Sequence, residues 1–201
     1  KTQNITENNF TDWRMDKDQL WTLTLNSTTK NYTLTKDALG FSAIVKEIKN
    51  DELNIENDID PQASQSQIGI ALTQQNTALL KSNINNRMLL VNSKTSQPML
   101  VDKFLISKYN NWWLMWSKWE LWSYNENENP YLLNRSGEHL EQVLPLDKYN
   151  TLVLVWADKT TVLFPYYSVS HEFLNEKISN PIADTENKIL YFIKKIGRAH
   201  V

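Results

Sequence analysis

Glu120 is the first candidate for a catalytic acid in this sequence. It lies between Trp119 and Trp122 in the aromatic segment YNNWWLMWSKWELWSY. Glycoside hydrolysis uses two carboxyl groups across a cleft, tryptophan rings stack on sugars, and apolar surroundings favour the protonated form that a general acid requires. A simpler interpretation, which we favour, is that Glu120 pairs with Lys118 on the same face of a strand or points into water.

Other combinations of catalytic residue types are weaker. Ser136, His139 and Asp158 are of the types that act as nucleophile, base and orienting acid, but the sequence has no G-x-S-x-G nucleophile motif. His171 is followed by glutamate, yet Asn175 stands where the H-E-x-x-H zinc motif needs its second histidine. The sequence therefore predicts no catalytic residue, no metal site and no cofactor.

Composition excludes several functional classes. The 201 residues include 21 basic and 23 acidic side chains, and this net charge of −2 offers no field that would attract nucleic acid. Cysteine is absent, which excludes disulfides and thiolate chemistry within this sequence, and the four glycines form no phosphate-binding loop. The aromatic segment is shorter and more charged than a bilayer-spanning helix of about 20 apolar residues. We predict neither a nucleic-acid partner nor a transmembrane segment.

The tryptophan-rich segment, residues 109–124, holds five of the eight tryptophans. Both alternating sets of its side chains are mostly apolar, which is typical of a strand that is covered on both faces. The tryptophans at 113, 116, 119 and 122 recur every third residue, a spacing that fits neither a strand nor a helix. One interpretation places all these rings in the core. The other leaves some as a platform that binds a ligand, for which the candidates are Trp113, Trp116, Trp119, Glu120 and Trp122.

Several hairpins are predicted to position this segment. Residues 20–26 alternate between apolar residues and threonine, and a turn connects them to residues 31–35, giving a hairpin with one threonine-lined face. Residues 151–157 are nearly all apolar, like a central strand, and pair with residues 160–167, which end or lie at an edge because of Pro165. Further strands are predicted at residues 88–92, 98–107 and 187–194.

Helices are predicted between these strands, so the expected fold class is α+β, with antiparallel hairpins forming one main sheet and a few flanking helices. Residues 36–49 have apolar residues at helical spacing after Thr35 as a cap, although Gly40 weakens this prediction and a strand over residues 41–48 is the alternative. A second helix is predicted within residues 68–86, and a short one over residues 171–178.

The predicted domain organisation follows changes in composition. Residues 1–50 form an N-terminal hairpin-plus-helix subdomain, residues 51–67 an acidic and polar linker, and residues 68–195 the main α+β domain. Asp58 and Asp60 in the linker lack the pattern of a calcium-binding loop, so we interpret them as solvated. Residues 196–201 match one reading frame of a common sequencing adapter, so we interpret them as an artefact, with a genuine polar tail as the alternative.

From these features we expect a non-enzymatic binding or assembly module that uses part of the tryptophan-rich strand to contact a protein or a glycan. The alternative is a truncated hydrolase acting on a polymer such as a glycan, with Glu120 as its candidate acid. A third hypothesis, peripheral membrane contact through exposed tryptophans, is disfavoured because no basic segment flanks them.

Overall fold

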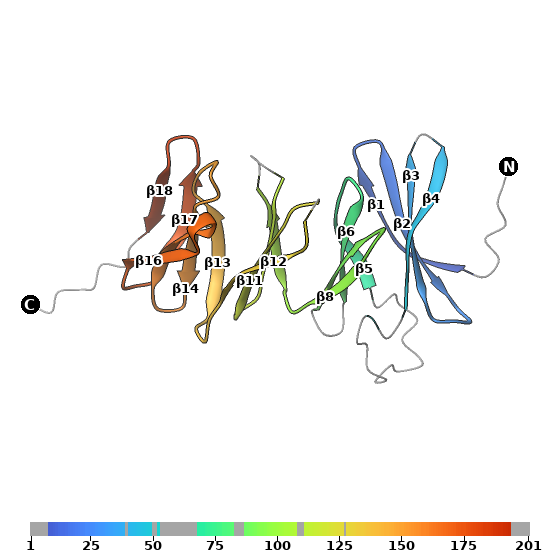
Figure 1. The fold of residues 1–201 in the computed structure, drawn as a ribbon, viewed down its shortest axis with the longest axis horizontal. Helices are drawn as coiled ribbons and strands as arrows, with labels where there is room; N and C mark the ends of the chain where they lie inside the picture. The colour runs from blue at the N-terminus through green and yellow to red at the C-terminus, as the bar shows by residue number, and fades with distance from the viewer. Residues whose placement is uncertain are drawn as a thin grey trace, which may run out of the picture. The chain divides into compact units, whose positions relative to one another are not determined.

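The computed structural model describes residues 8–38, 40–49, 52, 68–82, 87–107, 111–126 and 128–193. In these residues the chain forms 18 strands in five antiparallel sheets and contains no α-helix (Figure 1). The prediction of an α+β fold with one main sheet is therefore wrong, and the fold class is all-β. No helix in this part of the chain is long and apolar enough to cross a membrane.

The chain divides into two compact units, Lys1–Leu100 and Val101–Val201. The first unit contains two sheets of four strands each. Sheet 1 consists of β1 (Asn8–Asp16), β2 (Gln19–Asn26), β3 (Tyr32–Ala38) and β4 (Phe41–Ile48). Sheet 2 consists of β5 (Ile68–Gln74), β6 (Thr77–Ser82), β7 (Met88–Asn92) and β8 (Ser96–Met99). Each strand pairs with the next one along the chain, so both sheets are antiparallel meanders.

The second unit continues this pattern with sheets 3, 4 and 5. Sheet 3 consists of β9 (Lys103–Ile106), β10 (Trp113–Trp116), β11 (Glu120–Tyr124) and β12 (Tyr131–Arg135). Sheet 4 consists of β13 (Leu140–Pro145), β14 (Leu152–Trp156), β15 (Thr160–Phe164) and β16 (Val169–Leu174), with the 3-10 turn η2 (Pro165–Tyr167) before β16. Sheet 5 consists of β17 (Ser179–Asp184) and β18 (Ile189–Ile193).

The sheets form a structural repeat. The first strands of sheets 2 to 5 begin at residues 68, 103, 140 and 179, a spacing of 35 to 39 residues. A recurring four-stranded antiparallel sheet is also the unit of β-propeller blades, and sheets 1 to 4 each have that form when taken singly. Sheet 5 has two strands in the part of the chain that the structure describes.

Apolar faces of neighbouring sheets pack together within each unit. In the first unit Trp21, Leu23 and Leu34 of sheet 1 belong to one buried cluster with Leu80 and Val91 of sheet 2. In the second unit sheet 4 is covered on both faces, since alternate residues of β14 join two different clusters. Leu154 packs with side chains of sheet 3, and Val153 and Val155 pack with side chains of sheet 5. The uninterrupted apolar sequence of β14 follows from this double burial.

The three predicted helices are strands. Residues 36–38 belong to β3 and residues 41–48 to β4, as the alternative strand over 41–48 required, and the turn between the two strands contains Gly40 at φ +83°. Residues 68–86 contain β5 and β6, whose short buried apolar runs cannot be distinguished from a buried helix by spacing alone. Residues 169–174 pair with β15 as strand β16, although a helix was predicted over residues 171–178.

Two predicted hairpins and two predicted short strands are confirmed. The hairpins predicted at 20–35 and 151–167 are β2–β3 and β14–β15, and the short strands at 88–92 and 187–194 are β7 and β18. The predicted strand at 98–107 is divided between β8 and β9. The predicted linker, residues 51–67, lies outside the described residues except for Glu52, and so do residues 196–201.

Tyr32 makes the stability of the first unit sensitive to alkaline pH. Its ring is buried, and burial raises the pKa of the phenol above the ordinary 10.0. As pH rises, the unfolded chain loses this proton first, so the stabilisation is complete below about pH 10 and is lost as pH passes the folded-state pKa. We expect Tyr32→Phe to flatten the decline in the urea midpoint above about pH 10. An equal decline in both proteins would contradict this assignment.

Gly69 allows Asp12 to join the two sheets of the first unit. The Asp12 carboxylate accepts a hydrogen bond from the Ile70 backbone N–H at 2.6 Å, and Arg14 Nη1 donates to the Ala71 carbonyl at 2.7 Å. A Cβ atom at position 69 would lie 2.9 Å from Asp12 Oδ2, closer than normal contact. The absence of a side chain at Gly69 is therefore what lets this carboxylate reach the backbone of β5.

We expect Gly69→Ala to lower the free energy of unfolding by about 1–3 kcal/mol, because the methyl group displaces the Asp12 carboxylate from its hydrogen bond. Urea denaturation measures the loss. Gly137→Ala is the matched control, since a Cβ atom there meets nothing within 4 Å. In an Asp12→Ala background the Gly69→Ala change should cost much less, and additive losses would show that the two residues are not coupled.

Candidate functional site

The structure separates the predicted site residues by exposure. Trp113 and Trp116 belong to β10, where they are 1% and 6% exposed, whereas Trp119 is 51% exposed in the turn that follows. Trp122 is half-buried on β11. The predicted single strand over residues 109–124 is therefore wrong, because the turn at 117–119 divides it into β10 and β11. This break explains why the tryptophans recur at every third residue without fitting a single strand, since it places Trp119 outside both β10 and β11.

Trp113 and Trp116 are core residues. The Trp113 ring meets Tyr124 edge-to-face at a centroid distance of 5.6 Å. Trp116 packs on the other face of β10 against Leu140, Leu154 and other side chains of sheet 4. Neither ring can stack on a ligand without unfolding of the sheet, so these two residues contribute packing to the site and no contact surface.

Glu120 is held by Arg135 and Trp122. Arg135 lies directly opposite Glu120 on β12, and its Nε and Nη2 donate to Glu120 Oε1 at 3.0 and 2.8 Å. Trp122, two residues along on the same face of β11, donates from Nε1 to Glu120 Oε2 at 3.0 Å. The expected partner Lys118 makes no such contact. Sequence reasoning missed Arg135 because the pairing of β11 with β12 decides this contact, across 15 positions of the chain.

Three turns of the second unit meet around Trp119, and we call residues 117–119, 136–139 and 157–159 the three-turn surface. Backbone hydrogen bonds join the turns: Ser136 N–H donates to the Trp119 carbonyl at 3.0 Å, and Ala157 N–H donates to the His139 carbonyl at 3.0 Å. Leu140 N–H also donates to the Lys118 carbonyl at 2.8 Å. Because bonds connect each turn to the next, the backbone beneath Trp119 is fixed without a ligand.

An aromatic pair surrounded by charge occupies this surface. The Trp119 and His139 rings lie 5.5 Å apart at an angle of 40°. Beside them Lys159 Nζ and a Glu138 carboxylate oxygen are 2.6 Å apart, and this hydrogen bond raises the pKa of the Lys159 ammonium group. Arg135 and its partner Glu120 adjoin two of these turns in the chain, and together with Lys159 and Glu138 we call them the charged rim. The three turns and the residues next to them thus carry an exposed indole ring and two ion pairs.

Ser136, His139 and Asp158 all belong to the three-turn surface, but they do not form a catalytic triad. Ser136, His139 and Asp158 lie on two adjoining turns. Ser136 Oγ accepts a hydrogen bond from Glu138 N–H at 3.0 Å, and the His139 ring faces Trp119. In the described part of the chain no hydrogen bond connects the side chains of these three residues, and no group of acidic or histidine side chains could hold a metal ion. His171 lies on β16, and its ring is edge-to-face with the Phe164 ring at a centroid distance of 6.0 Å.

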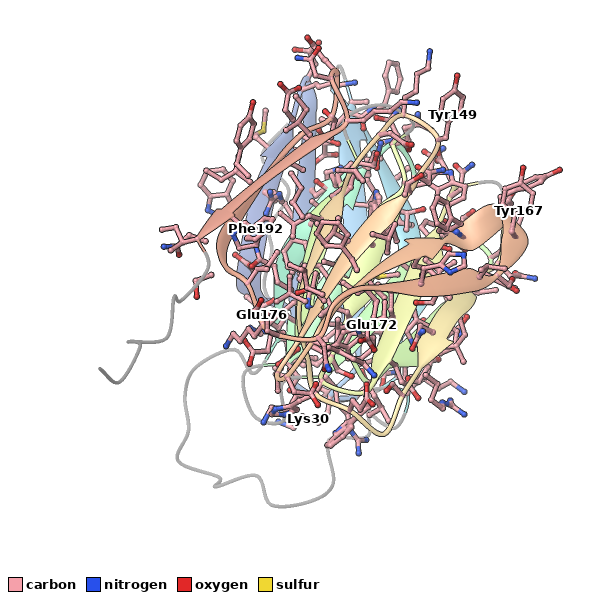
Figure 2. The ribbon with its side chains drawn as sticks, turned by 90° about the vertical axis from the view of Figure 1, so that its left-hand side faces the viewer. Lys30, Tyr149, Tyr167, Glu172, Glu176 and Phe192 are labelled. Carbon is pink, nitrogen blue, oxygen red and sulfur yellow. The ribbon has the colours of Figure 1, made fainter. Side chains whose placement is uncertain are left out.

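A second candidate site, which sequence reasoning missed, is a tyrosine-lined pocket of about 390 Å³. Its walls come from the β13–β14 loop and from the region around η2, and its lining residues are Asp147, Tyr149, Thr151, Phe164, Pro165, Tyr166 and Tyr167. Figure 2 shows Tyr149 and Tyr167 projecting outward on the same side of the view. The pocket and the three-turn surface lie at opposite ends of β14, since one is built on the loop before this strand and the other on the turn after it.

Asp147 organises the wall of the tyrosine pocket. Its buried carboxylate accepts hydrogen bonds from the backbone N–H groups of Tyr149 and Thr151 at 2.8 and 3.0 Å, and from Thr151 Oγ1 at 2.8 Å. The ammonium groups of Lys148 and Lys188 lie 5.2 and 5.3 Å from the centre of the Tyr149 ring. The spacing of Asp147, Tyr149 and Thr151 is that of an Asx-type turn, which is the signal in the sequence that could have located this loop.

Comparison with known protein families, with curated proteins and with solved structures found no match to this chain.

Proposed function

We propose that this chain is a non-enzymatic binding module that holds a protein partner at the three-turn surface. The observation that carries the proposal is the half-exposed Trp119 ring on a backbone that hydrogen bonds already fix. Tryptophan and arginine are enriched among the residues that dominate protein–protein binding energy, and Trp119 and Arg135 supply both. A preordered surface also loses less conformational entropy when it binds.

The surroundings of Trp119 favour a protein over a glycan. One side of the indole ring faces His139, so a flat sugar-stacking platform is only partly available. The rim carries Arg135 and Lys159 together with Glu120 and Glu138, and mixed charge of this kind selects a partner by electrostatic complementarity. The matching feature in the partner is therefore an apolar pocket with charged groups at its edge.

The contacts of Glu120 favour binding over the hydrolase alternative. Both of its carboxylate oxygens accept hydrogen bonds, from Arg135 and from Trp122. A general acid needs a proton to donate and a second carboxyl group across a cleft. In the position that Glu120 occupies, the carboxylate acts as an acceptor that orients Arg135 and the Trp122 ring.

Comparative affinity capture tests the proposal. The full chain, Trp119→Ala and Tyr131→Ala are immobilised and exposed to the same mixture of native proteins, and retained proteins are quantified by mass spectrometry. Tyr131 is the matched control because its exposed aromatic ring lies on β12 in the same unit. We expect the wild type and Tyr131→Ala to retain at least one protein in equal amounts. Trp119→Ala should retain at least about tenfold less of that protein, which is the loss typical of a dominant contact residue.

Two outcomes would overturn this proposal. One is a set of retained proteins that is the same for Trp119→Ala and Tyr131→Ala. The other is binding on a glycan array that is lost in Trp119→Ala while no protein depends on this residue, which would make the partner a sugar. Circular dichroism of both variants establishes that they are folded, as expected for exposed side chains.

A second candidate function, sugar binding, is favoured by the tyrosine pocket. Tyr149, Tyr166 and Tyr167 are exposed, and tyrosine presents a flat apolar ring with a polar hydroxyl group to a ligand. The pocket volume of about 390 Å³ lies within the range of small-molecule sites. Chemical shift changes of the tyrosine rings on addition of oligosaccharides, abolished in Tyr166→Ala, would support this function. No shift with any neutral or acidic oligosaccharide would exclude it.

A further inference from the structure

Two lysine side chains meet at the ring of Tyr149, which lines the tyrosine pocket. Lys148 Nζ and Lys188 Nζ lie 5.2 and 5.3 Å from the centre of this ring, and both lysines are exposed. Lys148 belongs to the β13–β14 loop of sheet 4, and Lys188 belongs to the turn between β17 and β18 of sheet 5. Two sheets of the second unit thus bring positive charge to one wall of the pocket.

No acidic side chain neutralises these two lysines. In the part of the chain that the structure describes, no carboxylate forms an ion pair with either ammonium group. Asp184 begins the turn that contains Lys188, but its carboxylate accepts hydrogen bonds from Asn187 N–H and Asn187 Nδ2 at 3.1 and 2.9 Å. A third hydrogen bond comes from Glu186 N–H at 3.2 Å. These bonds keep the Asp184 carboxylate within its own turn.

The one carboxylate in the pocket wall, that of Asp147, is also engaged. It is 7% exposed, and it accepts hydrogen bonds from the Tyr149 and Thr151 N–H groups and from the Thr151 hydroxyl group. These donors compensate for its burial. Against this single buried negative charge stand the two exposed positive charges of Lys148 and Lys188. The charge beside Tyr149 therefore favours an anion.

The backbone at Lys188 is strained. Its φ of +58° lies in the left-handed region, which the Cβ atom of a lysine disfavours and which glycine adopts without that cost. Strained positions of this kind cluster at sites that bind ligands. The Lys188 side chain reaches the ring of Tyr149 from this strained position. This makes Lys188 a candidate for direct contact with a ligand.

We propose that the tyrosine pocket binds an acidic saccharide, whose carboxylate or sulfate group pairs with Lys148 and Lys188 while a sugar ring stacks on Tyr149. This inference rests on the sugar binding proposed for the pocket and names the class of sugar. Tyrosine offers a flat apolar ring to a sugar, and lysine binds anions as a mobile point charge, so a carboxylate and a sulfate both fit. A cationic ligand is disfavoured because two ammonium groups already lie over this ring.

A glycan array of neutral, uronate-bearing and sulfated oligosaccharides tests this inference. We expect the full chain to bind acidic members of the array and Tyr166→Ala to lose that binding, which assigns it to the pocket. Calorimetry then compares the acidic oligosaccharide that binds most tightly with its neutral counterpart, either the methyl ester of a uronate or the desulfated form. The acidic form is expected to bind about tenfold more tightly. Raising the salt from about 0.1 M to about 1 M should remove most of this difference.

Variants of the two lysines locate the contact. Lys148→Gln and Lys188→Gln are each expected to raise the Kd for the acidic form about fivefold and to leave the Kd for the neutral form unchanged. Lys188→Gly should act in the same way, since glycine keeps the left-handed backbone without strain. Lys177→Gln is the matched control, because it removes an equal charge from an ammonium group that pairs with Glu141 at 2.6 Å. Glu141 lies at the start of β13, whereas the pocket loop follows the end of that strand.

Equal binding of the acidic and neutral forms would overturn the inference and leave sugar binding at the pocket intact. A preference for the acidic form that persists in the double variant Lys148→Gln/Lys188→Gln would also overturn it, since the anion would then bind elsewhere. If no binding on the array depends on Tyr166, both the inference and sugar binding at the pocket fail. Sugar binding that is lost in Trp119→Ala and kept in Tyr166→Ala would place the sugar on the three-turn surface and overturn both as well.

Discussion

Trp113→Ala is expected to lower the free energy of unfolding by about 3–5 kcal/mol, the range for removal of a buried aromatic side chain. The ring is 1% exposed and meets Tyr124 edge-to-face across the β10–β11 pair. Its removal leaves a cavity that the paired strands cannot close without losing their register. Urea denaturation followed by far-ultraviolet circular dichroism measures this loss without relying on the deleted chromophore.

Trp119→Ala is the control against which the loss of stability in Trp113→Ala is compared. The same substitution at a half-exposed ring in the neighbouring turn is expected to change the free energy of unfolding by less than about 1 kcal/mol. A large difference between the two variants separates the packing role of one tryptophan from the surface role of the other. Equal losses would mean that the Trp119 ring is also part of the core, which would contradict its assignment to a binding surface.

Asp147→Ala is expected to lower the free energy of unfolding by about 2–3 kcal/mol, because three donors lose their shared acceptor. The carboxylate is 7% exposed, so water cannot readily replace it beside Tyr149 and Thr151. The wall of the tyrosine pocket should lose its fixed form at the same time, which near-ultraviolet circular dichroism of the tyrosines would detect.

Asp147→Asn is the matched control for this variant. Its amide oxygen can keep the two backbone hydrogen bonds to Oδ1, and only the contact with the Thr151 hydroxyl is changed. We expect a loss of less than half that of the alanine variant. If Asp147→Ala unfolds at the same urea concentration as the wild type, the carboxylate does not hold this loop together.

Alternation between apolar residues and threonine was sufficient to predict the hairpin β2–β3, and a continuous apolar run was sufficient to predict the central strand of β14–β15. Apolar residues at mixed spacings led instead to the prediction of a helix within residues 68–86, where two short buried strands place Leu72, Leu79 and Leu80 at spacings that a helix also permits. Strand pairing distinguishes two short strands from a helix here, and the local spacing of apolar residues does not determine that pairing.

Only part of the candidate site could be predicted from the spacing of residues. The spacing of three among the tryptophans correctly implied that no single element buries all of them on one face, and Trp119 is the ring that lies outside the strands. The sequence could not indicate that Arg135 pairs with Glu120, or that the β13–β14 loop meets η2 to form a pocket. Both contacts join segments that come together only when the sheets form.

The burial of β14 on both faces has a consequence for how the second unit opens. Leu154 and Val153 are neighbours in sequence, yet each belongs to a different hydrophobic cluster, so β14 cannot leave its place without disrupting both clusters. The amide protons of Leu152–Trp156 should therefore exchange with solvent only when sheets 3, 4 and 5 open together, while strands at the margins of the sheets exchange by local fraying. One strand thus couples three sheets into a single cooperative unit.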